Sequence, residues 1–160
     1  MKKSNLCPHC NKIFTTYSNP FPTVDVIIYD PQCLDRGIVL IERSNPPYGF
    51  ALPGGFIDEG ESAEHAAIRE MQEETSLSVE LVGVLGVYSK PNRDPRFHTL
   101  SITFVGKTIN IKELCSGDDA KSGAFFPLHS LPELVFDHAH IIDDFILFLA
   151  NKRHLIPINA

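Results

Sequence analysis

The chain has 160 residues, of which 43% are hydrophobic and 21% charged, and its net charge is −6. This length suits one domain with a sizeable hydrophobic core. The acidic balance and the scattered basic residues argue against nucleic acid or an anionic membrane as a partner. No apolar run is long enough to cross a membrane and the first residues lack the apolar stretch of a secretory signal, so we expect a cytoplasmic protein.

Residues 1–22 are predicted to form an N-terminal extension, because Asn19-Pro20-Phe21-Pro22 interrupts regular structure before the domain, which we place at 23–155. Alternation of apolar residues predicts a strand over 23–30, and a continuous apolar run predicts a strand buried on both faces over 37–42. Further strands are expected at 50–52, 78–89, 98–109 and 123–128, with polar loops at 90–97 and 116–122.

Two helices complete the pattern. The segment 61–75 is rich in Ala, Glu, Arg and Met and contains no Gly or Pro. The segment 138–152 carries large apolar residues at helical spacing. Because strands and helices are mixed without regular alternation, we expect an α/β fold with a mixed sheet and flanking helices, in preference to a doubly wound parallel sheet.

The first of these helices carries three glutamates on one face. On a helical wheel Glu70, Glu73 and Glu74 fall within about 100° of one another, beside alanines that would allow the helix to approach a sheet closely. Crowded and partly desolvated carboxylates repel one another, and a divalent cation such as Mg²⁺ relieves both penalties. The alternative is a solvated acidic face balanced by Arg69. Two adjacent glycines and several further acids upstream favour the metal site.

The segment 55–77 resembles the Nudix box, which is a Gly, five residues, a Glu, seven residues, then Arg-Glu-apolar-any-Glu-Glu-any-Gly-apolar. The matching residues are Gly55, Glu61, Arg69, Glu70, Met71, Glu73, Glu74 and Leu77. Ser76 stands where the family has Gly, a position that normally ends the helix in a left-handed conformation. This departure concerns the end of the helix and not the binding of a metal.

The resemblance implies a Nudix-type α/β/α sandwich and metal-dependent hydrolysis of a nucleoside diphosphate linked to another moiety. By match to the box, Arg69 would orient a neighbouring glutamate, and the box glutamates would be the catalytic acids. The residues that would hold Mg²⁺ or Mn²⁺ are Glu70, Glu73 and Glu74, with Glu61 directly or through water and the carbonyl of Gly55 as a further ligand. The oligomeric state stays open, a homodimer included.

The segments 19–25, 88–98 and 117–121 resemble ADP-ribose pyrophosphatase-like members of the family, so we expect ADP-ribose to be cleaved to AMP and ribose 5-phosphate. NADH, a nucleotide sugar and an oxidised nucleoside triphosphate are alternative substrates, and a module that senses a nucleotide without cleaving it is an alternative function. Arg93 and Arg96 could grip the diphosphate, and Phe97 or Tyr88 could stack on adenine. Otherwise this segment is a proline-stiffened surface loop with solvated arginines.

Asp118 and Asp119 lie in a short polar segment between two predicted strands. Such a loop could bring a general base to the attacking water. A box glutamate is the main rival for this role, and an exposed turn with Asp as turn former is the structural alternative.

Cys7-Pro8-His9-Cys10 has the spacing of half a zinc ribbon. A tetrahedral Zn²⁺ site needs two more ligands, and the chain has no second Cys-x-x-Cys. Cys33, Cys115, His9 or a second subunit could supply them. We expect a knuckle without metal, or a disordered tail, in preference to Zn²⁺ bound at Cys7 and Cys10.

Overall fold

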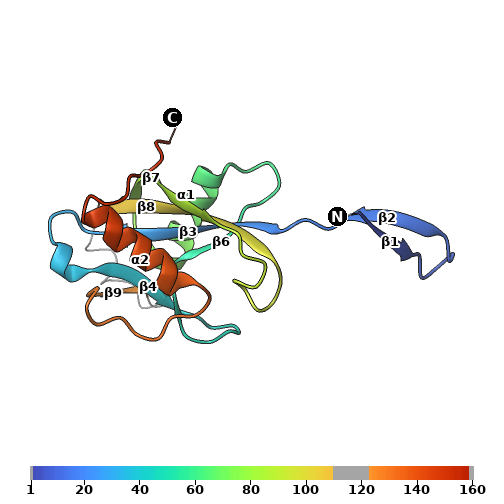
Figure 1. Ribbon diagram of the computed structural model, residues 1–160, viewed down its shortest axis with the longest axis horizontal. Helices are drawn as coiled ribbons and strands as arrows, with labels where there is room; N and C mark the ends of the chain where they lie inside the picture. Colours follow the sequence, from blue (N-terminus) through green and yellow to red (C-terminus); the bar gives the residue numbers. More distant parts are fainter. Residues whose placement is uncertain (1, 110–122, 159–160) are drawn as a thin grey trace.

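A computed structural model describes residues 2–109 and 123–158 of the chain. Its main body is a seven-stranded sheet with the order β5-β4-β3-β8-β7, in which β6 also pairs with β3 and β9 with β4 (Figure 1). The strands are β3 (Phe21–Tyr29), β4 (Ile38–Glu42), β5 (Phe50–Ala51), β6 (Gly54–Phe56), β7 (Val79–Tyr88), β8 (Thr99–Thr108) and β9 (Gly123–Phe126). Strands β3 and β8 are parallel and the other pairs antiparallel, so the sheet is mixed, as predicted.

One helix covers each face of this sheet. The helix α1 (Ala63–Thr75) packs Ala66, Ala67 and Met71 against one face of β3, which presents Val24, Val26 and Ile28. The helix α2 (His138–Leu149) packs Ile141, Ile142 and Phe145 against the other face, where Ile27, Ile38 and Leu40 lie. The predicted α/β/α sandwich is therefore confirmed, and so is the alternation of β3 between two cores.

The ends of both helices have local causes. α1 begins two residues later than predicted because the Ser62 hydroxyl caps it and accepts a hydrogen bond from the amide of His65 at 3.2 Å. Ser76 ends α1 with φ 55°, which confirms the predicted left-handed conformation. α2 stops at Leu149, earlier than predicted, because Asn151 takes a positive φ of 55°.

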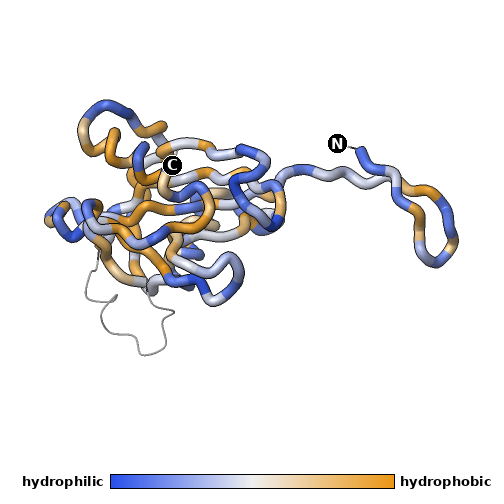
Figure 2. Tube along the Cα trace, turned by 60° about the horizontal axis from the view of Figure 1, so that its bottom comes forward, coloured by the Kyte–Doolittle hydropathy of each residue, from blue (hydrophilic) through white to orange (hydrophobic). Residues whose placement is uncertain are grey.

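The extension contains a hairpin that the sequence did not predict. Strands β1 (Lys2–Leu6) and β2 (Ile13–Tyr17) pair antiparallel, and Figures 1 and 2 show this hairpin projecting away from the sheet. β6 was missed as well, because three residues that include two glycines carry no strand pattern. A short 3₁₀ helix, η1 (Leu34–Arg36), precedes β4. Within the described residues no helix is long and apolar enough to cross a membrane.

Candidate active site

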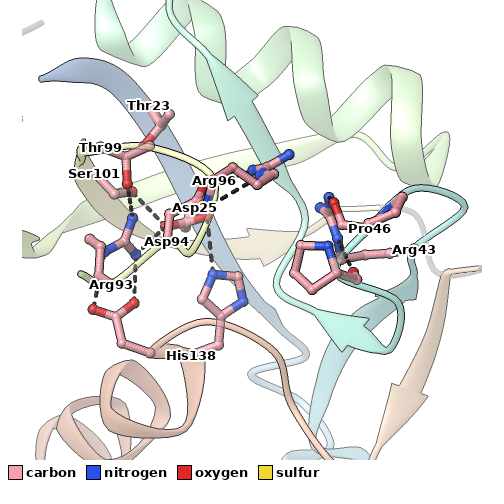
Figure 3. Close-up of polar contacts among 12 residues, drawn as sticks. Thr23, Asp25, Arg43, Pro46, Arg93, Asp94, Arg96, Thr99, Ser101 and His138 are labelled. Atoms are coloured by element: carbon pink, nitrogen blue, oxygen red, sulfur yellow. Dashed lines mark hydrogen bonds and ion pairs between the residues drawn. The ribbon is translucent and has the colours of Figure 1, made fainter. Parts of the chain in front are cut away.

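A pocket of about 130 Å³ lies where β3, β6, the loop before β8 and the start of α2 meet. Figure 3 shows the polar groups around it, with Arg93, Asp25 and His138 gathered on one side and Arg43 on the other. The residues that line it include Thr23, Asp25, Arg43, Gly54, Gly55, Phe56, Arg93, Asp94, Arg96, Phe136 and His138. The lining therefore includes the arginine loop and the two glycines of β6, which contact Glu74 and Glu70 of α1 on their other side.

The two glycines of β6 allow α1 to come close to the sheet at this point. β6 pairs with β3 so that Gly54 lies opposite Asp25 and Gly55 opposite Val24. A Cβ atom on Gly54 would collide with the Val24 carbonyl oxygen, and one on Gly55 would collide with the Glu70 carboxylate. Because neither residue has a side chain, carboxylates of α1 reach the backbone that edges the pocket.

Arg69 gathers three of the box glutamates around one guanidinium. Its Nη2 donates to Glu61 at 2.9 Å, and its Nη1 contacts Glu70 at 2.8 Å and Glu73 at 3.4 Å. Nη2 also donates to the Phe56 carbonyl at 3.0 Å, which ties α1 to β6. The hydrogen bond from Arg69 lowers the pKa of Glu61, whereas burial raises the pKa of Glu70 despite the same arginine.

Glu74 stands apart from this group. Its carboxylate accepts a hydrogen bond from the Gly54 amide at 2.8 Å, and burial raises its pKa to about 7, with repulsion from Glu70 adding to the effect. In the described part of the chain, no Lys, Arg or His lies within ion-pair distance of Glu74. An ionised carboxylate here is therefore desolvated without a paired cation.

These residues fit a divalent cation, although they are not yet arranged around one. Among the residues that the structure describes, no three His, Cys, Asp or Glu side chains converge as a metal site, because Arg69 holds Glu61, Glu70 and Glu73. The donor set is nevertheless all carboxylate and carbonyl oxygen, which suits Mg²⁺ or Mn²⁺. Glu74 lacks a cation, and the bare Cα of Gly55 leaves room for the Glu70 carboxylate. A hard cation would relieve both carboxylates.

Arg93 lines the pocket and has partners within the protein that the sequence did not indicate. This side chain is buried, and its Nε and Nη2 donate to the two carboxylate oxygens of Asp137 at 3.0 and 2.7 Å. Nη1 donates to the Thr99 hydroxyl at 3.1 Å, and Nη2 also contacts Asp25 at 3.3 Å. With these donors engaged by the protein, Arg93 supports the pocket and is not a free diphosphate clamp.

Tyr88 also makes contacts that the sequence did not indicate. It is buried beneath α2, and its hydroxyl donates to Asp144 at 2.7 Å. Arg153 holds the other oxygen of Asp144 at 2.6 Å. Burial and the Asp144 carboxylate both raise the pKa of Tyr88. Tyr88 therefore belongs to the α2 side of the core and does not line this pocket.

Arg96 lines the pocket, and Phe97 packs against Phe56, which also lines it. Arg96 donates through Nε and Nη2 to Asp94 at 3.0 and 2.8 Å, and its guanidinium lies 5.3 Å from the centre of the Phe136 ring. Its Nη1 makes no hydrogen bond among the described residues. Phe97 is partly exposed and packs with Phe21 and Phe56 at ring distances of 5.0 and 5.9 Å.

Arg43 is a site residue that the sequence did not indicate. Its Nε donates to the Pro47 carbonyl at 2.9 Å and its guanidinium lies 4.9 Å from the centre of the Phe136 ring. No carboxylate in the described part of the chain lies within ion-pair distance of it, and burial lowers its pKa. The available signal was its place directly after the buried strand β4.

His138 and Asp25 form the floor of the pocket. The imidazole Nδ1 accepts a hydrogen bond from the Leu52 amide at 2.9 Å, and Nε2 lies 3.6 Å from Asp25. Ser101 donates to the same aspartate at 2.5 Å. Burial lowers the pKa of His138, so the imidazole is neutral at pH 7 and its Nε2 carries the proton that faces Asp25. Asp118 and Asp119, the predicted base loop, lie outside the described residues.

The comparisons with known proteins agree with this geometry. A model of the NUDIX domain matches residues 19–145. An ADP-ribose pyrophosphatase from Methanocaldococcus jannaschii is 47% identical over 137 residues, which cover 84% of this chain and 78% of that relative. A mutT/nudix family protein from Listeria innocua has a structure with a TM-score of 0.67 and 32% identity, covering 84% of this chain and 98% of that one.

A further solved structure is the NUDIX domain of Shewanella oneidensis NrtR, complexed with ADP ribose. It has a TM-score of 0.68 and 24% identity, covers 83% of this chain and 90% of that one, and supports the fold alone. The domain match covers most of the chain, and the Methanocaldococcus jannaschii relative is similar over 84% of it. The chain belongs to the Nudix family.

Proposed function

We propose that the protein is a pyrophosphohydrolase that cleaves ADP-ribose to AMP and ribose 5-phosphate with Mg²⁺ or Mn²⁺ bound at the box. The observation that carries this proposal is the 47% identity to an ADP-ribose pyrophosphatase over 84% of the chain. The likeness extends over 137 residues, far beyond the 23-residue span of the box. A similarity of that extent supports a shared substrate as well as a shared reaction.

The acidic side of the site is assigned to the metal. Glu70, Glu73 and Glu74 would hold the cation, with Glu61 and the Gly55 carbonyl beside them. When bound, the cation would neutralise phosphate charge and lower the pKa of a coordinated water. Arg69 would position Glu61 and Glu70, whose carboxylates it contacts at 2.9 and 2.8 Å. Gly54 would fix the orientation of Glu74 through its amide.

The basic side of the pocket is assigned to the diphosphate. Arg43 has no carboxylate partner in the described part of the chain, and the Nη1 group of Arg96 makes no hydrogen bond there. Both guanidiniums pack against the ring of Phe136, which holds them at the pocket while leaving N–H donors available. A planar guanidinium can donate two parallel hydrogen bonds to phosphate oxygens. Arg43 thus takes the role that the sequence suggested for Arg93.

The aromatic group Phe21, Phe56 and Phe97 is assigned to the adenine. The three side chains are 52%, 42% and 37% exposed, so a ring face is available to a ligand. Phe56 also lines the pocket, which links this group to the diphosphate side. An exposed aromatic group next to two arginines is suited to a base joined to a diphosphate.

The general base is assigned to the Asp118–Asp119 segment or to a box glutamate. Both choices follow from the need for a carboxylate near the attacking water. Comparing the pH dependence of kcat in the double variant Asp118→Asn/Asp119→Asn and in Glu73→Gln separates them. Loss of the acidic limb of the profile, together with most of kcat, identifies the group that accepts the proton.

The test of the proposed function is a substrate panel. The purified chain is incubated with Mg²⁺ or Mn²⁺ and with ADP-ribose, NADH, a nucleotide sugar or 8-oxo-dGTP, and products are separated by ion-exchange chromatography. We expect AMP and ribose 5-phosphate from ADP-ribose, with the highest kcat/KM of the four. Glu74→Gln is the control for a contaminating hydrolase. A higher kcat/KM for another substrate would replace ADP-ribose, and tight binding of ADP-ribose without cleavage would indicate a sensing module.

A further inference from the structure

The turn of the N-terminal hairpin carries two cysteines, Cys7 and Cys10. The turn is closed by the hydrogen bonds Cys7 N to Lys12 O at 3.0 Å and Asn11 N to Cys7 O at 2.9 Å, with Asn11 at φ 55°. Cys7 and Cys10 thus lie three positions apart on one short turn of the hairpin, which is the spacing and the setting of a pair of thiolate ligands.

One chain does not complete a metal site at this turn. Tetrahedral Zn²⁺ takes four ligands, and within the described residues no third Cys, His, Asp or Glu joins Cys7 and Cys10 in a metal-sized group. Cys33 immediately precedes η1, which lies at the opposite end of the molecule from the hairpin (Figure 1). The same two cysteines from a second copy would supply the remaining pair of thiolates.

The hairpin also has an apolar face that the described residues leave uncovered. Leu6 pairs with Ile13 and Lys2 with Tyr17, so these two pairs share one face of the ribbon. Leu6, Ile13 and Tyr17 are 66%, 74% and 71% exposed, and Figure 2 shows hydrophobic stretches on this projecting segment. A two-stranded hairpin is at best marginally stable by itself in water. Packing against the same face of another hairpin would bury these side chains beside the thiols.

The charge of the extension is compatible with a second copy only when the metal is bound. Residues 1–24 contain Lys2, Lys3 and Lys12 and no Asp or Glu, in a chain of net charge −6. A zinc ion with four thiolates has a net charge of −2, so it offsets the repulsion between two positively charged hairpins. Without such a centre, the lysines would oppose the approach of a second copy.

We propose that Cys7 and Cys10 are one half of a structural zinc site that the hairpin of a second copy of this chain completes. The site would be separate from the metal site on α1 and independent of the hydrolase activity. It would join two chains through their N-terminal hairpins and order segments that are otherwise weakly supported.

The first experiment measures metal and mass together on the full chain purified in the presence of zinc. Metal analysis should give one zinc per two chains, and light scattering should give twice the 17.8 kDa mass of one chain. After exchange with Co²⁺, the visible spectrum should be that of tetrahedral cobalt with four sulfur ligands. One zinc per chain, no zinc at all, or a monomer that retains zinc would each overturn the proposal.

Variants then identify the ligands. Cys7→Ser and Cys10→Ser should each lose the zinc and its cobalt spectrum, while far-ultraviolet circular dichroism and thermal unfolding show that the body of the fold is retained. Cys33→Ser and Cys115→Ser are the matched controls and should keep one zinc per two chains, as should His9→Ala. Loss of the metal in Cys33→Ser, Cys115→Ser or His9→Ala would place a ligand outside the four proposed thiolates and overturn the shared site.

Discussion

Arg93 and Asp137 form a bidentate ion pair, in which Nε and Nη2 of the guanidinium donate to the two carboxylate oxygens at 3.0 and 2.7 Å. Asp137 is the residue before α2, and Arg93 lies in the loop between β7 and β8. The pair therefore fixes the arginine loop to the start of a helix that packs on the opposite face of the sheet from α1. This buried contact therefore fixes the position of the loop that forms the rim of the pocket.

Replacing Arg93 should lower the stability of the fold more than it weakens substrate binding. Arg93→Ala leaves Asp137 and Asp25 without their cation in a buried setting, so we expect the free energy of unfolding to fall by about 3 kcal/mol or more. Urea unfolding measures this loss. Arg96→Ala is the control, because its partly exposed pair with Asp94 should cost no more than about 1 kcal/mol. A stable Arg93→Ala protein with a raised KM would instead restore Arg93 as a diphosphate ligand.

Replacing Arg43 should lower kcat/KM and change stability little, the opposite of what we expect for Arg93. Loss of a charged hydrogen bond to the diphosphate costs about 1.5–3 kcal/mol, so Arg43→Ala should lower kcat/KM for ADP-ribose by about tenfold to a hundredfold. Arg43→Lys should recover only part of this, since the two parallel donors are lost. Arg36→Ala is the matched control, because Arg36 pairs with Asp30 and does not line the pocket. Wild-type kinetics in Arg43→Ala would remove Arg43 from the site.

Glu74→Gln separates the catalytic cost of a carboxylate from its structural cost. Gln keeps an oxygen for the Gly54 amide but loses the charge, so we expect kcat to fall by more than about a hundredfold with the fold intact. Because burial disfavours the ionised carboxylate of Glu74, the melting temperature without added metal should stay the same or rise. Kinetics at saturating Mg²⁺ and a thermal melt in EDTA provide the two readings. Turnover near that of the wild type would exclude Glu74 as a metal ligand.

Ser76→Gly should stabilise the protein. Ser76 has φ 55°, where a Cβ atom is unfavourable, and its amide already donates to the Gln72 carbonyl at 3.1 Å. Glycine removes the strain and keeps the hydrogen bond, so we expect a gain of up to about 1 kcal/mol with unchanged Mg²⁺ affinity. Ser78→Gly is the control, because no strain is relieved there and the greater freedom of the unfolded chain should lower stability. A lower melting temperature for Ser76→Gly would mean that its hydroxyl makes a contact worth more than the strain.

His138 should make the fold sensitive to mild acid. Burial keeps its folded pKa below the unfolded value of about 6.5, although Asp25 and Asp137 favour the charged form while Arg93 and Arg43 oppose it. Below that pH the unfolded chain binds a proton that the folded chain does not, so stability falls as pH falls, by at most about 1.4 kcal/mol per unit. Urea unfolding between pH 7.5 and 5.5 should give a steeper decline for the wild type than for His138→Gln. Equal slopes would show that the pKa of His138 is the same in the folded and unfolded protein, contrary to this prediction.

The sequence was most informative where structure depends on neighbours in the chain. The alternation in β3, the two-sided burial of β4 and the left-handed Ser76 all follow from local patterns, and the box residues lie within one turn-and-helix unit. The roles of the arginines depend on tertiary contacts that no spacing reveals. Arg93 meets Asp137 across 44 positions and is buried, whereas Arg43 is left without a carboxylate and faces the pocket. The same reason applies to the contacts of Tyr88 and to the hairpin of the extension, which depend on pairing partners that local patterns do not reveal.

The parallel pairing of β3 with β8 has a consequence for the order of folding. Residues Phe21 to Tyr29 of β3 pair with residues Thr99 to Lys107 of β8. One edge of β3 therefore stays unpaired until this much later part of the chain has been synthesised. During synthesis α1 and its carboxylates emerge before β8, so the sheet against which α1 packs still lacks one of its central strands. Closing such a long loop is slow compared with forming local contacts. The box can therefore form its helix early, but the pocket beside it can be completed only after β8 and α2 have left the ribosome.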